Sequence, residues 1–272
     1  MERESILHGQ SRIPMRKPTA YPSLTLALRT LEGSVVVYSI DEERQSSELG
    51  TLPAGMQSVC IFQNHLVALN QAGEVRFGPV TPVELPARSA DFTGIQRLSA
   101  SKDHLVLLTA DNELLFIDER LEVSRRARFA HPIKDLHLGE ESTLWIAGGE
   151  AVLGGYQVFW SADWESFRQI PWPASAVALY GDRDGIVWTV NSNTEIWKLH
   201  RLGEGNMPGC RQDTSCRNCM FKSYKGAARV ASVEGLFLVL HPDGTLRGHP
   251  FPGASEVSVV WRDVAHFAVS VG

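Results

Sequence analysis

Short apolar runs joined by turn residues recur along nearly the whole chain. Each run is rich in Val, Ile, Leu and aromatic residues, and Gly, Asn, Asp or Ser separates the two runs of a pair. Runs this short suit strands rather than helices, and the residues between them tolerate a positive φ or bond their own backbone, as tight hairpins require. The pattern predicts six β-hairpins, over 24–40, 65–77, 104–117, 143–160, 186–199 and 236–249.

A further short apolar strand precedes five of these hairpins. The five strands begin at positions 58, 95, 133, 176 and 228, so that successive starts lie 37, 38, 43 and 52 residues apart. Four-stranded propeller blades repeat about every 40–45 residues, and the longest interval contains an insertion. Stacking such blades in a ring buries the two apolar faces that a single blade would leave exposed. The spacing therefore predicts a β-propeller.

The two ends of the chain complete the pattern. No strand precedes the first hairpin, but the chain ends in a short apolar strand, 266–271, which begins 17 residues after the last hairpin ends at 249. We therefore predict an all-β fold: a six-bladed β-propeller of four-stranded blades, closed by the C-terminal strand pairing with the N-terminal hairpin. A β-sandwich or two small β domains stay open as alternatives, although no Pro-, Gly- or Ser-rich linker divides the repeats.

Composition adds the domain limits and excludes some classes of protein. Residues 1–22 are polar and predict a disordered tail, and 23–272 form the propeller domain, with a Cys-rich basic insertion at about 200–225. The chain has neither a secretory h-region nor an apolar run of 18 residues, so we expect a cytoplasmic protein that does not bind membranes. A formal net charge of −5 argues against nucleic acid as the partner.

The repeats resemble the WD40-like, Kelch-like and sialidase-like β-propeller superfold over roughly 24–272. The resemblance lies in period and pattern, because no blade has the Trp-Asp dipeptide of WD40 repeats or the double Gly of Kelch repeats. One segment, 161–167 (SADWESF), is similar to the Asp-box turn of sialidase-like propellers, but it lacks the Gly of that box. The box is a structural turn in that family, so this resemblance implies no catalytic residue.

The insertion contains the strongest local motif. Cys210, Cys216 and Cys219 have the spacing C-x5-C-x2-C, and His200 precedes them. Three thiolates and an imidazole form a closed tetrahedral set for a structural zinc ion, so these four residues are the candidate metal ligands. A disulfide within the loop and free thiols are the other two states that this spacing allows. Cys60, inside an apolar strand, is interpreted as a core residue.

The same insertion is basic. Between 198 and 229 it contains seven Lys or Arg residues and only two acidic ones, in a chain that is acidic as a whole. Such a surface suits an acidic partner protein, and a solvated loop is the alternative. The candidate partner-binding residues are Arg211, Arg217, Lys222 and Lys225.

These observations favour a non-enzymatic protein-binding β-propeller, such as an adaptor, a scaffold subunit or an inhibitor of a partner protein. No Ser-His-Asp order, HExxH motif or Gly-rich phosphate loop is present. Two alternatives stay open because fold alone does not settle function. One is a hydrolase or lyase with a site in the propeller channel, and the other is a propeller that binds a glycan or a small ligand.

Overall fold

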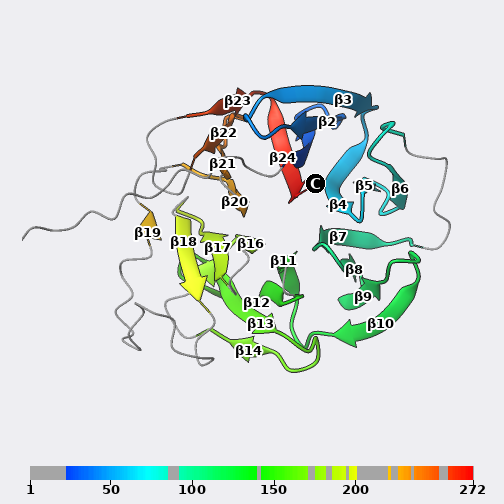
Figure 1. Ribbon diagram of the computed structural model, residues 1–272. Coiled ribbons are helices and arrows are strands. Elements are labelled where there is room, and N and C mark those ends of the chain that lie inside the picture. The colour runs from blue at the N-terminus through cyan, green and yellow to red at the C-terminus, as the bar shows by residue number, and fades with distance from the viewer. Residues whose placement is uncertain are drawn as a thin grey trace, which may run out of the picture.

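The computed structural model describes residues 23–84, 92–139, 142–170, 175–181, 186–193, 196–200, 220–221, 226–233, 236–250 and 257–271. Every element formed by these residues is a β-strand, and the strands form six antiparallel sheets arranged around a common centre (Figure 1). Nowhere in this part of the chain is there a helix long and apolar enough to cross a membrane.

In each sheet the strands follow one another from the centre of the molecule outward. The first three sheets contain, in spatial order, β24 (Val264–Val271), β1 (Leu24–Thr30), β2 (Val35–Ile40) and β3 (Ser46–Leu52); then β4 (Met56–Phe62), β5 (His65–Asn70) and β6 (Val75–Pro79); then β7 (Ile95–Ala100), β8 (Leu105–Thr109), β9 (Glu113–Ile117) and β10 (Val123–Arg128). The other three contain β11 (Ile133–Leu138), β12 (Leu144–Val152), β13 (Gly155–Ser161) and β14 (Arg168–Gln169); then β16 (Ala178–Gly181), β17 (Ile186–Val190), β18 (Ile196–His200) and β19 (Met220–Phe221); then β20 (Arg229–Val233), β21 (Leu236–Leu240), β22 (Leu246–His249) and β23 (Val259–Trp261).

All six predicted hairpins are present as antiparallel pairs. The prediction of four strands in every blade is correct only in part. Five sheets have four or more strands, whereas the sheet of β4, β5 and β6 has three among the described residues. β6 ends at Pro79, and Pro82 and Pro86 follow it in the sequence; proline lacks the N–H that a paired strand requires.

One predicted inner strand is divided in two. The sequence pattern predicted a single strand over 176–180, but β15 (Ser175–Ala176) pairs with β13 of the preceding sheet, and β16 begins at Ala178. The chain therefore leaves one sheet and enters the next within three residues. Val177 lies between β15 and β16 and donates its N–H to the carbonyl of Val190 in β17 (2.8 Å).

The C-terminal strand lies beside the first strand. β24 pairs antiparallel with β1 from Leu24↔Val271 to Arg29↔His266, and Figure 1 shows the red end of the chain next to the blue beginning. Each innermost strand also contacts the next, including β20 with β24 and β24 with β4. Apolar clusters fill the space between neighbouring sheets; in one of them, Phe62 and Leu69 pack with Leu98 and Leu107.

The hairpin turns after the second strands lie on one face of the molecule, which we call the turn face. On this face the turn of one sheet bonds the start of the next innermost strand. The carbonyls of Gly33, Gly73 and Gly244 accept the N–H groups of Met56 (3.1 Å), Ile95 (3.0 Å) and Val264 (2.9 Å), respectively. All three glycines have a positive φ, between 78° and 87°, which glycine adopts without steric cost. The bond to Val264 is the one that joins β24 to the sixth sheet.

Candidate binding site in the central channel

The innermost strands surround a cavity of about 490 Å³. Its wall is formed by residues of β4, β7, β11, β16, β20 and β24, and by Arg29 of β1. Small-molecule sites in proteins have volumes of roughly 300–1,000 Å³. The cavity is therefore large enough for a small molecule or for a side chain inserted by a partner protein.

Strand register places six residues of the innermost strands at equivalent positions, and all of them except Ala178 line the cavity. Five of them pair with a residue at or near the end of the second strand, as in Arg97↔Leu108 and Arg229↔Leu240, whereas Asp135 pairs with Ala147 in the middle of β12. We call these six residues the channel ring. The channel ring contains Ser58, Arg97, Asp135, Ala178, Arg229 and His266.

A β-bulge precedes four members of the channel ring. The register shifts directly before Ser58, Arg97, Asp135 and His266. A bulge inserts one extra residue and so redirects the side chains that follow it. The repeated bulge explains why polar side chains border the channel in strands whose other residues are mostly apolar.

Hydrogen bonds between neighbouring innermost strands hold the wall in position. Asp135 Oδ2 accepts the backbone N–H of Leu179 (2.8 Å), and Ser99 Oγ accepts that of Leu138 (2.9 Å). Ser58 Oγ lies 3.5 Å from Nε2 of His266. These bonds join β11 to β16, β7 to β11 and β4 to β24, so the polar groups of the channel also connect the sheets.

The wall of the channel is predominantly cationic. Arg29, Arg97 and Arg229 line it near the turn face, and Lys102 lies at the other end of β7, whereas Asp135 is the acidic residue of the lining. In the described part of the chain, no carboxylate forms an ion pair with any of the three guanidinium groups. A positive channel inside a protein of net charge −5 attracts anions.

The pKa values of the channel groups reflect burial and the arginines. Burial lowers the pKa of His137 to about 4, and the charge of Arg229 lowers it as well. Burial also lowers the pKa of His266 well below its usual value, and Arg229, Arg29 and Arg97 add to this effect. Both imidazoles are therefore neutral at pH 7. Burial raises the pKa of Asp135, while Arg229 and the Leu179 N–H oppose that rise.

Tyr180 stands at the centre of the aromatic part of the wall. Its ring stacks on Phe267 (6.0 Å between centroids), approaches His137 (5.8 Å) and lies under the guanidinium of Arg229 (5.3 Å). Tyr180 is 8% exposed, and its hydroxyl has no hydrogen-bond partner among the described residues, like Nε of Arg29 and Nδ1 of His266. Buried polar atoms are normally satisfied, so these three indicate a site that takes a polar ligand.

Comparison with known proteins supports the fold alone. No protein-family model and no curated protein sequence matches the chain. Among solved structures, the chain is similar to Hsv2 of Kluyvelomyces marxianus, with a TM-score of 0.52, 12% identity, and coverage of 84% of this chain and 76% of that chain. It is also similar to the β-propeller domain of Cps50 (Swd1) from Myceliophteria thermophila, with a TM-score of 0.51, 13% identity, and coverage of 79% and 74%. The computationally designed protein Ika8 has a TM-score of 0.51, 11% identity, and coverage of 87% and 84%.

The chain is an all-β propeller. The structural likeness and the arrangement of the sheets confirm the resemblance to the β-propeller superfold that the repeats indicated. At these low identities the likeness carries no function, which has to come from the site itself.

The structure does not describe the side chains that the sequence nominated. Cys210, Cys216, Cys219, Arg211, Arg217, Lys222 and Lys225 fall outside the described residues, and so does the side chain of His200, the last residue of β18. Within the part of the chain that the structure describes, no group of His, Cys, Asp and Glu side chains is arranged for a metal ion. Cys60 is a buried free thiol, as expected of a core residue, and burial raises its pKa.

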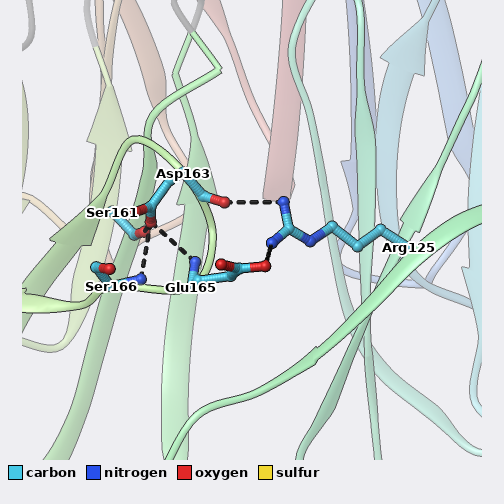
Figure 2. A network of polar contacts seen from close by, with 5 residues as sticks. All are labelled: Arg125, Ser161, Asp163, Glu165 and Ser166. Carbon is cyan, nitrogen blue, oxygen red and sulfur yellow. Dashed lines mark hydrogen bonds and ion pairs between the residues drawn. The ribbon is translucent and has the colours of Figure 1, made fainter.

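The segment similar to an Asp box forms a structural turn. Asp163 accepts hydrogen bonds from Ser161 Oγ (2.9 Å) and from the backbone N–H groups of Glu165 (2.9 Å) and Ser166 (2.7 Å) (Figure 2). Arg125, on the outer strand β10 of the preceding sheet, donates to the Asp163 carbonyl (2.9 Å) and pairs with Glu165. The turn therefore connects two sheets at their outer edge.

Trp164 completes this connection. Its ring stacks on Phe116 (4.3 Å, 9°) and meets His104 edge-on (4.8 Å). Its Nε1–H donates to the Ser142 carbonyl (2.6 Å). Trp164 has a positive φ of 62°. It lies one place before Glu165, which occupies the position of the Gly in the Asp box. Packing, rather than chemistry, is the role that these contacts support.

Sequence reasoning missed the channel ring. The inner strands were predicted, apart from the divided run 176–180, and two of them have a charged residue at their third position, in IQRLSA and IKDLHL. Aligning the strands on the turns of their hairpins would have placed Arg97 and Arg229 at one level of the repeat. The bulges before Arg97 and Asp135 have no signal in the sequence, and the side that these two residues face depends on them.

Proposed function

We propose that the chain is a non-enzymatic protein-binding β-propeller that holds an acidic partner protein on its turn face. In this proposal the ring has six blades and is closed by β24, as the pairing of β24 with β1 and the contact of β20 with β24 support. A closed ring is rigid, so loops on one face keep a constant spacing. The fold is one that suits such a role, and the surface around the channel mouth carries the argument.

The turn face combines exposed aliphatic side chains with the cationic mouth of the channel. Leu31 and Leu153, in the hairpin turns of the first and fourth sheets, are 59% and 82% exposed, and Val177, just before β16, is 40% exposed. Apolar residues around a charged centre are typical of protein interfaces. The arginines at the mouth supply attraction for an acidic surface, which increases the rate of association.

The proposal is tested by affinity capture from native lysate with three baits. The wild-type protein and a Val260→Glu variant are expected to recover the same partner in stoichiometric amounts. Val260 is 52% exposed, like the two leucines, but lies in the outermost strand β23, so it is the matched control. A Leu31→Glu/Leu153→Glu variant should recover at least fivefold less partner, because two negative charges meet an acidic surface. Quantitative mass spectrometry measures the recovery.

Two results would contradict the proposal. One is equal recovery of the partner by all three baits, which would place the interface away from the turn face. The other is the absence of any stoichiometric partner, even after chemical cross-linking. The wild-type complex should also weaken with salt, because the Debye length falls from about 8 Å at 0.15 M to about 3 Å at 1 M.

The basic insertion contributes a second contact in this proposal. Arg211, Arg217, Lys222 and Lys225 meet acidic groups of the partner, and a structural zinc ion held by Cys210, Cys216, Cys219 and His200 gives the insertion its shape. Support comes from the length of this connection, since loops of this size between regular blades usually have a function. The cation excess of the insertion, in an acidic chain, points to the same partner class.

Zinc binding has a direct measurement. Protein purified without chelator is expected to contain about one equivalent of zinc by elemental analysis, because three Cys and one His complete a tetrahedral site. A Cys216→Ser/Cys219→Ser variant should contain none, and a Cys60→Ser variant, which changes a buried thiol of the core, should keep the metal. A zinc content near zero in the wild type, or a disulfide between two of the three cysteines, would contradict this prediction.

An enzyme with its site in the channel is the second candidate, and one observation favours it. Asp135, His137, Tyr180 and His266 share the channel, and the pKa of each is shifted. Shifted titratable groups in a cavity are characteristic of catalytic sites. Turnover of a hydrolase or lyase substrate that Tyr180→Phe abolishes, without loss of partner capture, would support this candidate.

A further inference from the structure

We infer that the central channel binds a small oxyanion with two or more negative charges, held by Arg29, Arg97 and Arg229. These arginines also lie at the channel mouth that the proposed partner would face, but the channel wall exists in the protein alone, so anion binding can be tested without the partner. The shared chemistry of the ligand is a set of carboxylate or phosphate oxygens that accept hydrogen bonds.

The first argument is charge. Three guanidinium groups border one cavity of about 490 Å³, and within the described residues none of them has a carboxylate partner within ion-pair distance. Arg229 lies close enough to Asp135, His137, His266 and Arg29 to affect the pKa of each of them. Arg29 and Arg229 are partly buried and Arg97 is exposed, so their unpaired charges can be reached by a dissolved anion and attract it.

The second argument is hydrogen bonding. Arginine offers five N–H donors and no acceptor, and Nε of Arg29 is buried without a partner. The Tyr180 hydroxyl, also buried without a partner, adds a further donor to the wall. One oxygen of Asp135, the acidic group of the lining, already accepts the Leu179 N–H. A wall rich in donors is complemented by a ligand that only accepts, and guanidinium forks match carboxylate and phosphate oxygens.

The third argument is placement. Arg97 and Arg229 belong to the channel ring and lie in the third and sixth sheets, with Asp135 and Ala178 of the fourth and fifth sheets between them. Arg29 lies on β1 next to His266, the ring residue that follows Arg229. The three arginines therefore approach the channel from different sheets. This geometry surrounds a compact ligand, rather than following an extended chain along the surface.

Isothermal titration calorimetry with citrate and with pyrophosphate at constant ionic strength tests the inference. The wild-type protein should bind at least one of the two with a stoichiometry near one, and the arm that binds identifies carboxylate or phosphate as the preferred group. Arg97→Gln and Arg229→Gln should each weaken binding at least tenfold. Arg120→Gln is the matched control, because Arg120 is exposed in the turn after β9 and changes the net charge equally. It should bind like the wild type.

Several results would overturn the inference. They are the absence of saturable binding of either anion to the wild type, and equal weakening by Arg120→Gln. Circular dichroism tests whether each variant is folded. If a glutamine variant is unfolded, Arg97→Lys or Arg229→Lys replaces it, and the lysine variant should lose less affinity for the anion than a folded glutamine variant would. An acidic decapeptide of glutamate is the third ligand. Binding of the peptide alone would overturn the small-molecule inference and would support the acidic protein partner proposed above.

Discussion

Deletion of residues 264–272 is expected to leave a chain that aggregates or lacks a cooperative unfolding transition. β24 pairs along β1, so its loss would expose the hydrogen-bonding groups of β1 as an open edge. The deletion also removes Val264 and Phe267, each 2% exposed in the apolar cluster that joins the first, fifth and sixth sheets. Exclusion chromatography and a thermal unfolding curve measure the result.

A chain that lacks residues 1–20 is the control for this deletion. The sequence predicts that these residues form a disordered tail, so their removal should shift Tm by only about 2 °C or less. If the 264–272 deletion variant were soluble and unfolded cooperatively, near the Tm of the wild type, β24 would not be required to close the ring.

Replacement of Gly155 by alanine is expected to cost about 3–4 kcal/mol of unfolding free energy. Gly155 has a φ of 151°, and a Cβ at this position would lie 2.6 Å from the carbonyl oxygen of Ala176 and 2.7 Å from its carbon. Both are backbone atoms of β15, which pairs with β13 at this point. The backbone would have to shift where the chain passes from the fourth sheet to the fifth. Urea denaturation measures the change as a lower midpoint with an unchanged slope.

Gly55→Ala is the matched control, because Gly55 has a φ of 111° and no atom lies within 4 Å of an added Cβ. This variant has the backbone strain without the steric collision, so its free energy of unfolding should fall by only about 1–2 kcal/mol. The difference between the two variants measures the close approach of Gly155 to Ala176. Equal losses in both would show that this approach does not constrain the fold.

The amino-acid sequence by itself determined the strands and their hairpins. The signals are local: apolar runs of strand length, and turn residues whose side chains bond their own loop. In the first and second sheets, for example, Thr30 Oγ1 accepts the Ser34 N–H (3.1 Å) and Asn70 Oδ1 accepts the Glu74 N–H (2.9 Å). The even spacing of these hairpins then predicted a β-propeller, because a repeat of this kind can bury its faces only against copies of itself.

Local signals failed where the tertiary structure overrides them. The run 176–180 is apolar throughout and predicted one strand, but Ala176 pairs with the fourth sheet and Ala178 with the fifth. The prediction of four strands also failed for the sheet of β4, β5 and β6 among the described residues. The nominated metal and partner residues in the insertion lie outside the described residues and stay predictions.

The candidate site was decided by the tertiary structure alone. Arg97, Asp135 and Arg229 are far apart in the sequence, and each has the appearance of an exposed position on a strand. Only the ring brings them together: Ser58 and His266 meet across 208 residues of chain, and bulges turn their strands toward the channel. Hydrophobic periodicity records which residues avoid water, but it contains no information on which distant polar residues share a wall. That pairing depends on the number of sheets, their register and the extra residue in each bulge, and these are properties of the folded chain.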